Sequence, residues 1–256
     1  MRSFRLATDG VGAPRLESLP LPFLHIGPTA TEADQARTPD PALATHVRSV
    51  RPLSRHDGEV THSGDAAGRR LVFVVAGSLS VAVGTDLARL GPGDVLFLDH
   101  GAGGDHKLTW GGDARAFEVE VEDAWTPTGS VAPALEDPRA ESEAARTDRI
   151  HVADELAHFA ELDAFAPGDA QAVEHLSFLA FSPGIDADWH TEAAPTLVIV
   201  LTGGFELEVG GTGGARTFRP GDVCLTEDLH GQGHRTRTHG DTRVAAVGLP
   251  VGHRWS

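Results

Sequence analysis

The sequence predicts an all-β protein composed of two similar halves, and two internal matches support this prediction. In the first match, residues 89–106 and 217–234 share a Pro-Gly-Asp turn, a short apolar run, a glycine-rich loop and a histidine fourteen residues after the turn proline. In the second match, residues 71–84 align without gaps on residues 197–210, and each copy is typical of a strand, a glycine turn and a second strand. Because the matches occur in the same order, we interpret the chain as two copies of one fold.

The turns themselves follow from local backbone preferences. Proline sets φ for the second position of a tight turn, and glycine accepts the positive φ that follows. Residues 92–94 and 220–222 both read Pro-Gly-Asp, so we expect a turn and then a short strand in each half.

This combination of short β-runs, a glycine turn and a Pro-Gly-Asp turn resembles the cupin superfamily, and two copies in one chain resemble a bicupin. The resemblance covers roughly residues 45–122 and 173–250. It implies two tandem jelly-roll β-barrels that arose by internal duplication. The expected organisation is an N-terminal arm (1–44), a first cupin domain (45–125), a linker with a short helix (126–172) and a second cupin domain (173–256). Cupins include enzymes, sugar binders and storage proteins, so the fold alone leaves the function open.

Length and charge restrict the class of protein. A chain of 256 residues suits two domains of about 100 residues each. The formal net charge of −16 repels phosphate backbones and anionic membranes, so we expect neither nucleic acid nor a membrane as a partner. No segment approaches the roughly 20 apolar residues of a membrane helix. The single cysteine, Cys224, excludes an internal disulfide and fits a reducing cytoplasm.

The N-terminal arm is expected to be extended, because its prolines at positions 14, 20, 22, 28, 39 and 41 disfavour long helices. Its apolar side chains need a surface to cover, and they are Leu19, Leu21, Phe23, Leu24 and Ile26. The arm either packs along a sheet edge of its own barrel or crosses to a second subunit and forms a homodimer.

The main strands are expected at apolar or alternating runs. Those of the first barrel are residues 71–76, 79–83, 95–98 and 116–121, and those of the second are 174–181, 196–201, 205–209, 223–226 and 243–248. Between the barrels, Leu156, Phe159, Leu162 and Phe165 recur at intervals of three and indicate an amphipathic helix beginning near Asp154. A strand at residues 150–152 is expected before it.

The resemblance also implies a candidate metal site in the second half. Metal-binding cupins carry a glycine, five residues, a histidine, one residue, a second histidine, a later glutamate, and a last histidine after the Pro-Gly turn. In this sequence His190 follows Gly184 by that spacing, Glu192 stands where the second histidine would be, and His234 lies near the last one. Residues i and i+2 of a strand share a face, so His190 and Glu192 can both enter the barrel.

Two imidazoles and one carboxylate form the set associated with non-haem Fe(II), our first choice of metal, although Zn²⁺, Mn²⁺ and Ni²⁺ would also accept it. His230 is a candidate fourth ligand or acid–base group, and Glu192 is a candidate general base if it is not a ligand. The alternative is that His190 and His234 are hydrogen-bonded polar residues at a barrel mouth that holds no metal.

Two further sets of residues are candidates for a functional role. In the first half His62, His100 and His106 match or lie near ligand positions, but a carboxylate at ligand spacing is missing, so a structural role is favoured there. After His234, a cluster of arginines either forms a charged outer strand face or binds a substrate carboxylate, and its members are Arg235, Arg237 and Arg243.

The functional expectation is a metal-dependent bicupin enzyme that acts on a small organic molecule. Oxygenation is the first choice of reaction, because such a site leaves positions for substrate and O₂. Isomerisation or cyclisation with the metal as a Lewis acid is the second. The alternative of another class is a metal-free bicupin that binds a sugar or another small ligand.

Overall fold

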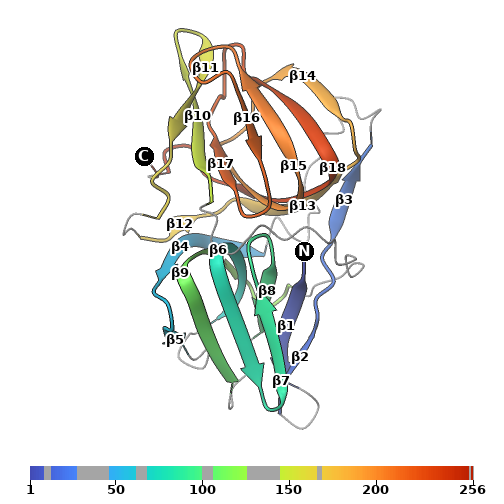
Figure 1. The fold of residues 1–256 in the computed structure, drawn as a ribbon. Coiled ribbons are helices and arrows are strands. Elements are labelled where there is room, and N and C mark those ends of the chain that lie inside the picture. The colour runs from blue at the N-terminus through green and yellow to red at the C-terminus, as the bar shows by residue number, and fades with distance from the viewer. Residues whose placement is uncertain are drawn as a thin grey trace.

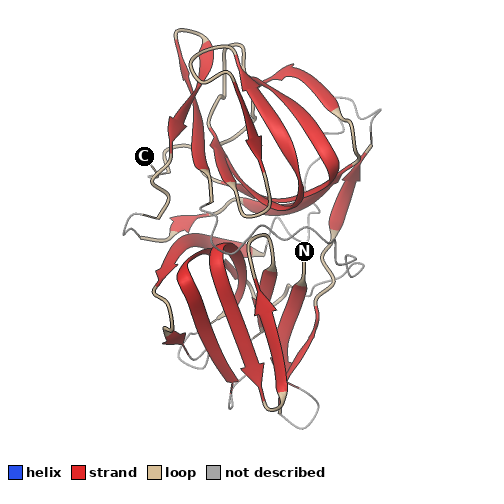
Figure 2. Cartoon of the chain, viewed as in Figure 1, coloured by secondary structure: helices blue, strands red, loops and turns tan. Residues whose placement is uncertain are grey.

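The computed structural model describes residues 1–8, 13–27, 46–61, 68–99, 106–125, 145–165, 169–253 and 255. These residues form two nine-stranded sheets that occupy separate lobes (Figures 1 and 2). The all-β prediction is confirmed, since every regular element in the described ranges is a strand. That part of the chain also contains no helix with the length and apolar character required to cross a bilayer.

The first sheet is formed mainly by the N-terminal half of the chain. Its strands are β1 (Ser3–Thr8), β2 (Pro14–Ser18), β4 (Val47–Arg55), β5 (Val60–Thr61), β6 (Arg69–Val83), β7 (Asp86–Leu90), β8 (Val95–Leu98), β9 (His106–Val121) and β12 (Gln171–Ala172).

The second sheet is formed mainly by the C-terminal half. Its strands are β3 (Phe23–Ile26), β10 (Thr147–Ala153), β11 (Leu156–Glu161), β13 (His175–Phe181), β14 (Asp186–His190), β15 (Thr196–Val209), β16 (Ala215–Phe218), β17 (Val223–Thr226) and β18 (His234–Gly248).

The two sheets follow the same order of pairing. The first runs β12-β4-β9-β6-β8-β1-β2, and the second, taken from its other edge, runs β3-β13-β18-β15-β17-β10-β11. The short strands also match, since β5 pairs with β9 as β14 pairs with β18, and β7 pairs with β6 as β16 pairs with β15. Each strand of one sheet therefore has a counterpart at the same place in the other.

One edge strand of each sheet comes from the opposite half of the chain. The arm strand β3 pairs in parallel with β13 of the second sheet, and β12 pairs with β4 of the first sheet. In Figure 1 the blue β3 runs beside the upper lobe although β1 and β2 belong to the lower one. The arm thus supplies edge strands to both sheets of its own chain.

The glycine turns expected at residues 77 and 203 are wrong, because neither glycine separates two strands. Each lies within one long strand, β6 or β15, at a shift of register against β9 or β18. Gly77 and Gly203 have φ of 68° and 65°, and a Cβ on them would fall 2.6 Å from the Gly111 carbonyl and 2.5 Å from the Asp241 carbonyl. These glycines bend a continuous strand by forming a β-bulge.

The helix predicted from Asp154 is also wrong, because β10 and β11 form an antiparallel hairpin there. Asp154 and Glu155 have φ of 51° and 62°, the positive values that a two-residue hairpin turn requires. In β11, Ala157 and Phe159 are buried while Leu156 is exposed, which is strand alternation. The preceding strand expected at residues 150–152 is confirmed as part of β10.

The largest core cluster joins residues of both halves. Phe73 of β6 and Phe178 of β13 lie 6.2 Å apart between ring centroids, and Trp255 of the C-terminal tail lies 5.7 Å from Phe117 of β9. Each sheet also buries a second apolar cluster of its own. The two lobes are therefore held together by a shared core.

Candidate functional site

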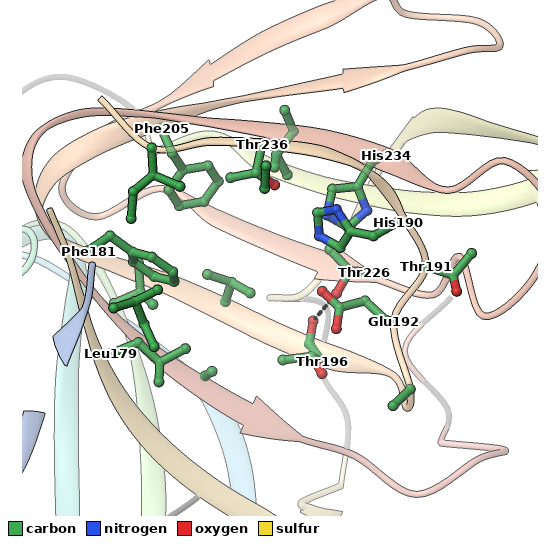
Figure 3. Close-up of a pocket in the computed structure, with 18 of the residues that line it drawn as sticks. Leu179, Phe181, His190, Thr191, Glu192, Thr196, Phe205, Thr226, His234 and Thr236 are labelled. Atoms are coloured by element: carbon green, nitrogen blue, oxygen red, sulfur yellow. Dashed lines mark hydrogen bonds between the residues drawn. The ribbon is translucent and has the colours of Figure 1, made fainter. Parts of the chain in front are cut away.

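A cavity of about 620 Å³ opens within the second sheet, and the three predicted ligand residues all line it. His190 ends β14, His234 begins β18, and the two residues are directly paired across these strands. Glu192 follows β14, and Figure 3 shows its carboxyl group near both imidazole rings. His190, Glu192 and His234 therefore lie together in one cavity.

His234 is held by a carboxylate that the sequence analysis missed. Its Nδ1 lies 2.6 Å from Oδ2 of Asp228, and the two residues are 2% and 0% exposed. Although burial by itself lowers the pKa of His234, the hydrogen bond and charge of Asp228, together with Glu192, raise it above the ordinary value. One sequence feature could have indicated this role: in the aligned motif copies, Asp228 stands at the position of His100.

The ring of His190 is oriented by its own strand. Its Nδ1 lies 2.7 Å from the Asp188 carbonyl oxygen, and because a carbonyl only accepts, Nδ1 carries the proton. The His190 and His234 rings are 4.5 Å apart between centroids and inclined by 56°. A metal would therefore be bound through Nε2 of His190, the nitrogen that lacks this proton.

Glu192 is linked to the same aspartate through the backbone. Its N–H donates to the Asp228 carbonyl oxygen at 3.2 Å, so Asp228 contacts both Glu192 and His234. Burial raises the pKa of the Glu192 carboxyl above its ordinary value and Asp228 adds to the rise, while His234 and a hydrogen bond with Thr226 oppose it. This carboxyl group holds a proton more readily than an exposed glutamate.

The donor types fit a divalent metal. Both imidazoles are hydrogen-bonded through Nδ1, His190 to a carbonyl oxygen and His234 to a buried carboxylate. Histidine ligands in metal sites are oriented in the same way. Within the described ranges, however, no group of three or more His, Cys, Asp or Glu side chains is positioned to hold a metal ion as it stands. The donors are present in one cavity, and their side chains would have to converge on the ion.

A glycine sets the distance between the strands that carry the two histidines. Gly233 has a φ of 73°, and a Cβ on it would overlap the carbonyl group of His190. Only glycine allows β14 to lie this close to the start of β18. Gly233 therefore belongs to the geometry of the site although it contributes no side chain.

The remaining predicted residues of the second half lie outside the cavity lining. His230 is exposed.

Arg235 pairs with Asp186 at 2.7 Å, and Arg237 pairs with Glu206 and Glu208 at 2.6 and 2.7 Å. These arginines alternate with the inward-facing His234, Thr236 and Thr238 along β18. Arg243 lies over the Phe23 ring, 5.3 Å from its centroid. Arg235 and Arg237 therefore form a charged outer strand face, one of the two alternatives expected for these arginines.

In the first half, His62 and His100 lie outside the described residues. His106 is buried at the place that corresponds to His234, since it faces Val83 of β6 as His234 faces Val209 of β15. The described interior around it is an apolar core cluster.

His175 is a further cavity residue that the sequence analysis missed. It begins β13 opposite Gly248, and its imidazole ring occupies the space that a Cβ on Gly248 would fill. Burial lowers the pKa of His175, although the charge of Glu174 opposes this. His175 therefore adds an imidazole whose pKa is lowered to the cavity wall.

No protein-family model matches the chain, and no curated protein sequence matches it. A cupin 2 conserved barrel domain protein from Leptotrichia buccalis is similar over 79% of this chain and 84% of its own, with 14% identity and a TM-score of 0.38. A salicylate 1,2-dioxygenase from Pseudaminobacter salicylatoxidans is similar over 79% and 71%, with 14% identity and a TM-score of 0.34. An oxalate decarboxylase from Lactobacillus farciminis is similar over 81% and 78%, with 12% identity and a TM-score of 0.29.

Proposed function

We propose that this chain is a bicupin enzyme that binds a divalent metal in its second barrel and acts on a small organic molecule. His190, Glu192 and His234 would hold the metal, and oxygenation is the first choice of reaction. The observation that carries the proposal is that these three residues line one cavity, with His234 fixed by the buried Asp228. The bicupin assignment is supported by the shared pairing order of the two sheets.

A bound divalent metal would supply Lewis acidity and, if it is Fe(II), O₂ chemistry. The other functions belong to the chain itself. Asp228 keeps the His234 proton on Nδ1 and so directs Nε2 away from itself. If Glu192 is not a ligand, its carboxyl group, whose pKa is raised by burial, would be suited to proton exchange with a substrate. The apolar side chains Leu179, Phe181 and Phe205 would pack against the part of a substrate that lies away from the reacting group.

A metal-free function is the second candidate, and the His234–Asp228 contact favours it. A histidine that is hydrogen-bonded to a buried carboxylate and lies near a second acid is an arrangement suited to general acid–base chemistry or ligand binding. The raised pKa of His234 allows it to donate a proton at pH values where an ordinary histidine is neutral. Isomerisation would need no oxidant.

Metal analysis separates the two candidates. We expect the purified protein to bind about one equivalent of Fe(II) or Zn²⁺, and His190→Ala and His234→Ala to lose it. His106→Ala is the matched control, because His106 has the same register in the other sheet. Absence of binding at micromolar metal would reject the metal-dependent proposal and leave the acid–base one, and equal loss in all three variants would reject the assignment to the second barrel.

A homodimer through the N-terminal arm remains a separate proposal. Within the chain the arm pairs β1 with β8 and β3 with β13. Sedimentation of the full chain and of Phe23→Ala at several concentrations tests it. A monomer at all concentrations would exclude the dimer.

A further inference from the structure

The cavity has two chemically different ends. In Figure 3, His190, Glu192 and His234 lie together at one end, and Leu179, Phe181 and Phe205 lie at the other. Leu179 and Phe181 alternate inward along β13, and Phe205 lies on β15, so the apolar end is formed by regular strands. A ligand that fills the cavity must therefore combine a polar end with an apolar body.

The cavity is maintained by small polar side chains at positions that the first sheet fills with large ones. Thr226, Thr236 and Thr238 line it, opposite Thr196, Leu207 and Phe205 of β15. The residues in the corresponding register of the first sheet are Leu98, Leu108 and Trp110, opposite Arg70, Val81 and Leu79 of β6. The same strand arrangement thus encloses packed side chains in one sheet and open space in the other. This contrast indicates a cavity built for a ligand.

The arm strand β3 completes the wall of the apolar end. Ile26 is paired with Phe181 in the parallel register of β3 and β13, it is 4% exposed, and it lines the cavity. Leu24 is paired with Leu179 in the same register but does not line the cavity. Ile26, a residue of the N-terminal arm, therefore forms part of the cavity wall in the second sheet, although β1 and β2 of the same arm belong to the first sheet.

We propose that the ligand is an amphipathic small molecule with an oxygen-bearing end and a compact apolar body, and that Ile26 limits the size of that body. The inference rests on the proposed small-molecule site, since it names the class of ligand for the same cavity. A volume of about 620 Å³ lies within the range of sites for drug-sized ligands and is several times the roughly 150 Å³ of a cavity that holds benzene. Oxygen functions suit the polar end, because imidazoles and a carboxyl group offer both donors and acceptors.

Straight-chain primary alcohols from propanol to dodecanol test this proposal, because their hydroxyl group needs no metal. Binding is measured calorimetrically with the full chain, both after chelation and after loading with Zn²⁺. We expect affinity to rise roughly fourfold per buried methylene and then to level off at the length that fills the apolar end. Ile26→Ala should move this plateau to longer alcohols by one or two carbons, and Ile26→Phe should move it to shorter ones.

Leu24→Ala is the matched control on the same strand and should leave the plateau where it is. Shifts in the same direction for both Ile26 variants, or an equal shift in Leu24→Ala, would overturn the assignment of Ile26. Absence of binding for every alcohol, or affinity independent of length, would overturn the ligand class. A different result would count against the metal proposal alone. In that case the chelated and the Zn²⁺-loaded protein would bind each alcohol with equal affinity, while affinity still depended on chain length.

Discussion

Gly221 lies directly against Pro92, so the two Pro-Gly-Asp turns contact each other between the lobes. A Cβ on Gly221 would fall 2.6 Å from the Pro92 Cβ, and a Cβ on Gly93 would fall 3.0 Å from the Pro220 Cβ. Both glycines have positive φ, 83° for Gly93 and 88° for Gly221. In each turn the aspartate accepts a bond from its own turn backbone, Gly91 N–H to Asp94 and Arg219 N–H to Asp222.

This contact predicts that Gly221→Ala is strongly destabilising. The added methyl group would have an unfavourable φ and would meet the Val75 carbonyl oxygen at 2.5 Å as well as the Pro92 ring, so we expect a loss of about 2–4 kcal/mol in the free energy of unfolding. Gly84→Ala is the control, because Gly84 has a φ of 56° and no atom within 4 Å of the added Cβ. Its cost should be about 1 kcal/mol. Equal losses in urea titrations would show that the turn contact contributes nothing.

The Asp228–His234 contact predicts a specific effect of Asp228→Asn. Because Asp228 raises the pKa of His234, its neutral replacement should lower that pKa, which an NMR titration of the metal-free protein measures. Metal affinity should fall about 10- to 100-fold, as for other partners of histidine ligands. Asp186→Asn, which removes an exposed partner of Arg235, should change neither quantity. An unaltered His234 titration in Asp228→Asn would contradict the assigned contact.

Glu192→Gln distinguishes a ligand from a general base. If Glu192 binds the metal, the variant loses an anionic oxygen and metal affinity should fall at least about tenfold. If it acts only as a base, the variant keeps the metal and loses turnover. We expect the first result. A variant that keeps both metal and turnover would remove Glu192 from the site.

The ion pairs of Asp99 predict a pH-dependent contribution to stability. Burial alone raises the pKa of Asp99, but hydrogen bonds and charges from Arg5 and Arg69 lower it below 3.8. A carboxyl whose folded pKa is lowered stabilises the fold above its unfolded pKa, and this contribution disappears as the pH falls through the folded pKa. The difference in unfolding free energy between wild type and Asp99→Asn should therefore be constant near neutral pH and decrease below about pH 4. A difference that stays constant down to pH 2 would contradict this.

Much of the fold could be predicted from local patterns. The turn at Gly93 and its counterpart at Gly221 depend on the φ preferences of two adjacent residues, and the strands at residues 95–98 and 223–226 have the predicted bounds. The helix from Asp154 failed because the interval of three is not a common face here: in β11 Leu156 is exposed while Ala157 and Phe159 face inward, as strand alternation requires. The positive φ of Asp154 and Glu155, which makes a hairpin turn, is not evident from the apolar spacing.

Sequence alone was enough for the repeated Pro-Gly-Asp turns and the short strands that follow them, because each depends on residues close together in the chain. The set of His190, Glu192 and His234 was implied by the family that the sequence resembles, and it stays a prediction. The folded chain was needed to show that Asp228 is hydrogen-bonded to His234, that His230 and the arginines lie outside the cavity lining, and that Ile26 is part of it. Ile26 reaches this wall through the pairing of β3 with β13, between segments far apart in sequence. Such contacts depend on the register of whole strands, and local preferences do not specify that register.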